Sequence, residues 1–180
     1  ARDGYPHALW GGAWAQTPSR PSIGNGVDTP FQISTAAELA WFRDYVNGTI
    51  VDEGEAAGTT HPSASAKLTA DIDLTNYCHA AEDGKELLSW IPVGNIDNPW
   101  KGKMDGLGHT ISNLYIKTAQ NCVGLFGLTE DATIQDLIFD NAKVENVSTT
   151  NTNTVCTGIL AGYAFAYSNS PAHIKGIKTT

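Results

Sequence analysis

Basic residues are scarce in this sequence. Lys and Arg number 11 against 19 Asp and Glu, so the formal net charge is -8. Because phosphate backbones and anionic lipid surfaces attract basic faces, this balance argues against both as partners. Long apolar runs are also missing: a bilayer span needs roughly 18 apolar residues, and the nearest candidate, 155–167, is short and contains glycines. We therefore expect no nucleic-acid partner and no membrane span.

Cysteine is nearly absent, with only Cys78, Cys122 and Cys156. They form no CxxC pair and have no His at ligand spacing, which argues against a zinc site. The sequence also lacks the G-x-S-x-G, Walker A and Rossmann motifs. At 41% hydrophobic and 17% charged residues, 180 residues suit one globular domain rather than a disordered chain. We expect no catalytic residues, no metal and no cofactor.

The N-terminal region is extended and irregular, because residues 1–34 contain four prolines and five glycines. The chain begins at Ala1 without Met or an apolar signal core, which predicts a mature or trimmed product. Few basic residues, a single Met and abundant Thr, Asn and Gly are typical of secreted or cell-surface bacterial proteins. We therefore predict that localisation.

A helix follows this arm. Thr35 and Glu38 form a capping box, and Leu39, Phe42 and Val46 recur at helical spacing. Gly48 provides a left-handed stop. These signals predict a helix over 36–47 inside a capping segment, 35–48, whose apolar face covers the strands that follow.

Short strand-like segments separated by Gly, Asn and Asp fill the chain beyond Lys67. One template, I-x-x-[LI], recurs in Thr110–Ile116, Thr133–Phe139 and His173–Thr179. A second links Cys122–Gly127 with Cys156–Gly162. Repeated templates at unequal offsets favour stacked coils with variable loops, that is, a solenoid, over a sandwich.

The second template places Cys122 and Cys156 at equivalent positions. If the two segments are stacked neighbours, their Cα atoms lie about 5 Å apart, within the range of a disulfide. We predict an adjacent pair, either bonded or as stacked thiols, which leaves Cys78 as the unpaired cysteine.

Several motifs in a fixed order resemble the GLUG-motif family of secreted or surface-anchored bacterial proteins. The motifs lie in Phe31–Ala40, Lys67–Leu74, Trp90–Gly94, Trp100–Ile111 and Gly124–Gly127. The resemblance covers about residues 30–180. It implies an all-β fold, a right-handed parallel β-helix with an N-terminal capping helix. Residues 49–180 would form its coils, either complete or as the first part of a longer solenoid.

Two sets of residues are candidates for binding. Asp71 and Asp73 alternate along a strand with their carboxylates about 7 Å apart, a separation that suits a carboxylate pair or part of a calcium site. The tryptophans offer a sugar-stacking platform, and these are Trp10, Trp14, Trp90 and Trp100. For both sets a structural role in strands and packing is the favoured interpretation.

These observations favour a non-catalytic, adhesin-like or scaffold module that presents loops such as 50–66, 76–88 and 145–154. The expected partners are a glycan or a host glycoprotein, with further coils or another partner at the last coil. Two alternatives stay open. One is a carbohydrate-active β-helix enzyme, a polysaccharide lyase or glycoside hydrolase. The other is an accessory segment of a larger surface protease, because similar repeats precede the protease domain of some immunoglobulin-cleaving metallopeptidases.

Overall fold

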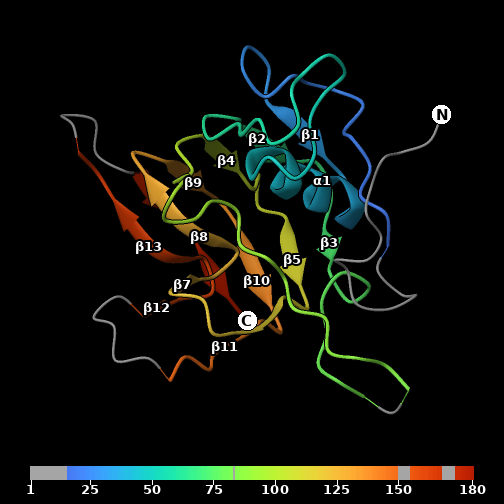
Figure 1. Cartoon of the computed structure of the whole chain (residues 1–180), viewed down its shortest axis with the longest axis vertical. Helices are drawn as coiled ribbons and strands as arrows, with labels where there is room; N and C mark the ends of the chain where they lie inside the picture. Colours follow the sequence, from blue (N-terminus) through green and yellow to red (C-terminus); the bar gives the residue numbers. More distant parts are fainter. Residues whose placement is uncertain (1–15, 83, 150–154, 168–172) are drawn as a thin grey trace.

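Very short strands and a single helix make up the described part of the chain (Figure 1). The computed structural model describes residues 16–82, 84–149, 155–167 and 173–180. The elements are, in order, β1 (Phe31–Ile33), α1 (Ala36–Val46), β2 (Ala66–Leu68), β3 (Ile72–Asp73), β4 (Lys103–Asp105), β5 (Thr110–Ser112), β6 (Tyr115–Thr118), β7 (Cys122–Val123), β8 (Phe126–Glu130), β9 (Thr133–Gln135), β10 (Ile138–Asp140), β11 (Lys143–Asn146), β12 (Cys156–Thr157), β13 (Ala161–Phe165), β14 (His173–Lys175) and β15 (Lys178–Thr179). No helix among these residues is both long and apolar enough to cross a bilayer.

The predicted helix is confirmed, and α1 begins where the capping box places it. The Thr35 side chain accepts a hydrogen bond from the Glu38 amide at 3.2 Å, and the Glu38 carboxylate accepts one from the Thr35 amide at 3.1 Å. Gly48, one residue past the C-cap Asn47, has a φ of +74°. These reciprocal bonds satisfy amides that the first helical turn leaves without partners.

Every pairing between the named strands is parallel, and the described strands divide into five small sheets. The largest has the order β1-β2-β4-β9-β14, and the next has the order β15-β10-β5-β3. Three two-stranded sheets pair β11 with β6, β12 with β7 and β13 with β8. Strands paired in one sheet therefore come from distant parts of the sequence.

The predicted right-handed parallel β-helix is wrong. The described strands form several small separate sheets beside one helix and do not close into a solenoid. Each strand is only two to five residues long, because a bend interrupts the chain after every few paired residues. The parallel direction of the pairing is the part of the expectation that the structure retains.

The first repeat template marks bends rather than stacked layers. The fourth residue of each seven-residue segment is Asn113, Asp136 or Gly176. All three residues have a positive φ, of 60°, 53° and 66°. The template therefore describes a strand, a left-handed residue and a second strand. The template aligns Ile111 with Ile134, but in the structure Ile111 pairs with Phe139 and Ile134 pairs with Met104. The aligned residues Ile134 and Ile174 do pair with each other.

The core lies between α1 and the sheets. Phe42 from the helix, Trp100 and Phe126 are fully buried. The Trp100 and Phe126 rings stack with centroids 4.5 Å apart, and Phe42 meets Trp100 edge-on at 6.4 Å. Aromatic stacking from helix to sheet thus joins the first elements of the chain to its middle strands.

The C-terminal strands lie at open sheet edges within the described residues. β14 and β15 end the two larger sheets, and β13 pairs only with β8 among the strands of its sheet. Tyr163 and Ile174 on these strands are 50% and 43% exposed. Figure 1 shows β12 and β13 on the far side of the sheets from α1.

Candidate functional site

Two of the four tryptophans proposed as a sugar-stacking platform are buried in the core. Trp90 and Trp100 are 1% and 0% exposed, so neither ring can meet a ligand. Each indole N–H donates to a backbone carbonyl, that of Leu125 at 3.3 Å for Trp90 and that of Ala64 at 2.9 Å for Trp100. Trp10 and Trp14 lie outside the described residues. The described tryptophans therefore serve packing.

Asp71 links the start of β3 to the start of β5 by hydrogen bonds. Its Oδ1 accepts hydrogen bonds from the Thr110 amide at 2.9 Å and from His109 Nδ1 at 3.2 Å. The Thr110 bond first, and then the His109 bond, lower the pKa of Asp71 below its ordinary value. A carboxylate held ionised in this way stabilises a turn and is poorly suited to donate a proton.

Asp73 begins a polar ladder that crosses β3, β5 and β10, three neighbouring strands of one sheet. Its Oδ1 accepts bonds from Asn113 Nδ2 and the Thr75 amide, both at 2.9 Å. Asn113 Oδ1 in turn accepts from Asn141 Nδ2 at 2.7 Å. Asn113 and Asn141 are both left-handed, with φ of 60° and 50°, so the ladder holds two bends in place. Asp71 and Asp73 thus both take part in hydrogen bonds that link neighbouring strands.

The ladder predicts a pH-dependent stability. Bonds from Asn113 and Thr75 lower the pKa of Asp73 in the folded protein below its value of 3.8 in the unfolded chain. The contribution of the carboxylate is therefore complete above the unfolded pKa and disappears as pH falls through the folded pKa. We expect Asp73→Asn to melt below wild type at neutral pH, with the difference closing in acid. Thermal melts across acid pH measure this, and Glu86→Gln, an exposed loop change of the same charge, controls for net charge. A pH-independent difference would contradict the prediction.

Four acidic residues in and beside β8, β9 and β10 also have structural partners or positions. Glu130 pairs with Lys101 at 2.9 Å, and Asp140 Oδ1 accepts from the Thr180 hydroxyl at 3.1 Å. Asp131 and Asp136 are left-handed bend residues, with φ of 52° and 53°. Within the described ranges, no three His, Cys, Asp or Glu residues gather closely enough to hold a metal ion.

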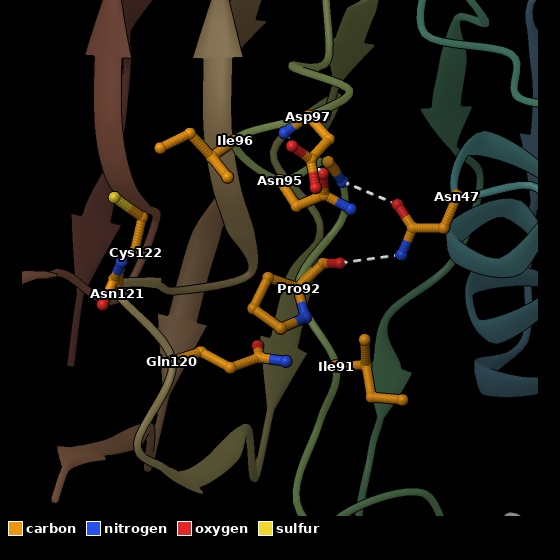
Figure 2. A pocket seen from close by; sticks show the side chains of 10 residues that line it. Asn47, Ile91, Pro92, Asn95, Ile96, Asp97, Gln120, Asn121 and Cys122 are labelled. Carbon is orange, nitrogen blue, oxygen red and sulfur yellow. Dashed lines mark hydrogen bonds between the residues drawn. The ribbon is translucent and has the colours of Figure 1, made fainter. Parts of the chain in front are cut away.

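An open pocket of about 410 Å³ lies beyond the C-terminal end of α1 (Figure 2). It is lined by Asn47, Ile91, Pro92, Gly94, Asn95, Ile96, Asp97, Gln120, Asn121 and Cys122. Asn47 holds one side of it, since its Nδ2 donates to the Pro92 carbonyl at 3.0 Å and its Oδ1 accepts from the Gly94 amide at 2.9 Å. The helix cap therefore positions the loop that forms this wall.

A tight turn shapes the rim of the same wall. The Asn95 side chain accepts hydrogen bonds from the amides of Asp97 and Asn98 at 2.9 and 3.0 Å. This turn exposes Ile96 and Asp97 at the surface, with Ile96 63% exposed. Asn side chains favour turns of this kind because they bond to backbone amides two and three residues further along, so Asn95 defines the shape of the rim.

The pocket combines amide, carboxylate and apolar side chains. Gln120 and Asn121 are exposed on the opposite wall from Asn47, while Ile91 and Ile96 provide apolar surface. Amide groups both donate and accept hydrogen bonds, which suits hydroxyl groups, and Asp97 adds one negative charge. The chemistry favours a neutral polyhydroxylated ligand and disfavours an anion.

This pocket could not be predicted from local sequence patterns, because its walls come from three distant segments. The Asn95–Asn98 turn and the polar pair after β6 are each ordinary loop signals in isolation. Only the pairing of Val93 with Phe126 brings the two loops to one place.

Cys122 and Cys156 lie opposite each other in the pairing of β7 with β12, as thiols. Burial first, and then a hydrogen bond with Cys156, raise the pKa of Cys122 to about 11. Cys78 is separate and buried: its sulfur accepts from the Tyr115 amide at 3.2 Å, and burial raises the pKa of its thiol to about 11. The register of the second template thus matches the structure at this pair.

Comparison with known proteins found two relatives, both much longer than this chain. The chain is 32% identical over 145 residues to halomucin of Haloquadratum walsbyi, a match that covers 77% of this chain and 1% of halomucin. It is 32% identical over 124 residues to a protein of Evansella cellulosilytica that is named a Gly-rich membrane protein, covering 68% of this chain and 11% of that protein. No family model matches the chain, and no solved structure does.

Proposed function

We propose that the chain is a non-catalytic module of a larger secreted or cell-surface protein, and that its pocket binds a neutral glycan segment. The amide-rich pocket is the observation that carries this proposal. Glycan hydroxyls need groups that both donate and accept hydrogen bonds, and Gln120 and Asn121 supply them beside the exposed apolar surface of Ile91 and Ile96.

The set of acidic groups supports binding over turnover. Glycoside hydrolysis uses a pair of carboxyl groups that flank the scissile bond. Among the residues lining the pocket, Asp97 is the single carboxylate, and no His lines it. Asp71 and Asp73, the pair suggested by the sequence, do not line this pocket, and each accepts hydrogen bonds from neighbouring residues of the fold. An enzyme of the lyase or hydrolase class therefore has less support.

The comparisons support placement in a larger surface protein. The chain spans about 1% and 11% of the lengths of its two relatives, so in each of them the matching region is one small part. The name of the second relative places that protein at a membrane. In such a setting, this chain would hold the pocket and its loops in a fixed arrangement. The GLUG resemblance fits this proposal and stays a prediction.

A binding screen with paired turnover assays tests the proposal. The wild-type chain is applied to arrays of glycans and glycoproteins, and each bound glycan is then assayed for new reducing ends and unsaturated products. We expect binding without product. Gln120→Ala combined with Asn121→Ala is expected to weaken binding by about 5- to 150-fold, because each of two lost hydrogen bonds contributes about 0.5–1.5 kcal/mol.

Gln16→Ala is the matched control, since it removes an exposed amide that is not part of the pocket lining. It should bind as wild type. Formation of product would overturn the non-catalytic assignment. Glycan binding that survives the double substitution would place the binding surface outside the pocket, and an absence of glycan binding would reject the glycan proposal altogether.

A further inference from the structure

The side-by-side thiols of Cys122 and Cys156 are positioned for a covalent link. β7 and β12 pair in parallel with Cys122 directly opposite Cys156 and Val123 opposite Thr157. Hydrogen bonds flank the pair: the Cys156 amide donates to the Asn121 carbonyl at 2.7 Å, and the Gly158 amide donates to the Val123 carbonyl at 3.0 Å. Paired residues on adjacent strands lie about 4.8 Å apart, inside the Cα separation of about 4.4–6.8 Å that disulfides adopt.

Both thiols lie on the outer side of their strands. Val123 is fully buried, and because side chains alternate along a strand, Cys122 faces away from the core. Cys156 is half-buried like Cys122, and the two side chains interact by a hydrogen bond. Cys122 is one of the residues that line the open pocket, but its sulfur points away from Asn47 and Pro92 on the other side of that pocket (Figure 2). Because the residue is partly exposed, a small molecule reaches the thiol pair from solvent at the outer face of the strands.

Cys78 is placed to take no part in this chemistry. It is 1% exposed and lies beneath Tyr115, whose amide bonds to its sulfur at 3.2 Å. This enclosure keeps a small disulfide from reaching the Cys78 sulfur, whereas Cys122 is partly exposed. The three cysteines therefore divide into one enclosed thiol and one accessible pair.

We propose that Cys122 and Cys156 are an oxidative crosslinking site, which closes to a disulfide by exchange with a low-molecular-weight disulfide that approaches the outer face of β7 and β12 from solvent. The Cys122 thiol loses its proton, and its sulfur attacks one sulfur of the small disulfide. The S–S bond of the small molecule breaks, and one small thiolate leaves and takes up a proton. Cys156, after losing its own proton, attacks the Cys122 sulfur and expels the second small thiol. Two protein thiols are oxidised, and the small disulfide is reduced to two thiols.

The crosslink would tie β12 to β7 and close a loop of about 35 residues, which restricts the unfolded chain. A restriction of this size corresponds to a rise in melting temperature of about 5–15 °C for a domain of this length. It would also fix Asn121 and Cys122 in the pocket wall. The site does not depend on the proposed glycan binding, because it stands on the pairing of β7 with β12. Disulfides persist outside the cytosol, where a secreted or surface module is located.

Oxidised glutathione, added to the reduced full chain at mildly alkaline pH, is the direct test. We expect wild type to lose about 2 Da in intact mass, the change for one disulfide. Peptide mapping should place the bridge between Cys122 and Cys156, and the melting temperature should rise by about 5–15 °C. Cys78→Ser is the matched control, and it should form the same bridge.

The single substitutions separate the two steps. In Cys156→Ser the exchange stops after the first step, so a glutathione adduct should accumulate on Cys122. In Cys122→Ser the bridge should be absent. An unchanged mass of wild type, a lasting glutathione adduct on wild type, or a mapped bridge that contains Cys78 would overturn the proposal. Mapping of the wild-type chain alone decides this point if a variant fails to fold.

Discussion

Trp100→Ala is expected to lower the free energy of unfolding by about 3–5 kcal/mol. The Trp100 side chain is fully buried, stacks on Phe126 at 4.5 Å and meets Phe42 edge-on at 6.4 Å. Its indole N–H also donates to the Ala64 carbonyl at 2.9 Å. Truncation would leave a cavity between the helix and the sheets, and it would leave that carbonyl without its donor.

Urea unfolding of wild type and variants measures this effect through the midpoint and slope of the transition. Trp100→Phe separates packing from hydrogen bonding, since it keeps an aromatic ring but lacks the N–H, and a smaller loss of about 1–3 kcal/mol is expected. Ile96→Ala, at a position that is 63% exposed, should change the free energy of unfolding by less than about 0.5 kcal/mol. A Trp100→Ala protein as stable as the Ile96 variant would show that the aromatic stack contributes little.

Local signals predicted the helix correctly. Its cap, apolar face and stop all lie within the continuous segment 35–48, so the residues that decide α1 are close together in the sequence. Leu39, Phe42 and Val46 are fully buried, as their helical spacing predicted. Nothing distant has to be known for such an element.

The strand register depends on a different kind of information. Thr110–Ile116 spans β5, the bend at Asn113 and the start of β6, whereas Thr133–Phe139 spans β9, the bend at Asp136 and part of β10. Both segments follow the same rule, in which buried residues flank a left-handed bend, so they look like repeats of one layer. The template does not show which segment pairs with which. That choice depends on the loop lengths and on contacts such as the pairing of Ile111 with Phe139. The predicted closed solenoid was wrong for the same reason.

The candidate site shows the same limit. Trp90 and Trp100 are of the residue type that stacks on sugars, but both side chains are buried and cannot contact a glycan. The Asp71 and Asp73 carboxylates have a spacing that suits a pair of acidic groups in a binding site. In the structure, both accept hydrogen bonds from residues in or directly after β5. Composition identifies residue types, but exposure is a property of the fold. The Cys122 and Cys156 match succeeded because both templates there begin at equivalent strand positions.

Asp44→Ala is expected to be as disruptive as the loss of a large core residue, with a decrease of about 3–5 kcal/mol in the free energy of unfolding. Asp44 and Arg43 form a buried ion pair in α1, with side chains 4% exposed and two bonds of 2.7 and 3.0 Å. The Arg43 guanidinium also lies 4.6 Å from the Trp90 ring centroid. Without the Asp44 carboxylate, a buried positive charge would lose the group that neutralises it.

The double variant Arg43→Met with Asp44→Leu separates the charge effect from the packing effect. Because it removes both charges and keeps apolar volume, it should be less destabilised than Asp44→Ala, although it contains one more substitution. Chemical unfolding at low and high salt measures all three proteins, and the ranking should not change with salt, since buried pairs are screened weakly. If the double variant were instead the least stable, the pair would stabilise the fold by mutual attraction beyond the cost of burying it. The buried charges would then be a source of net stability in α1 rather than a constraint that the surrounding core must accommodate.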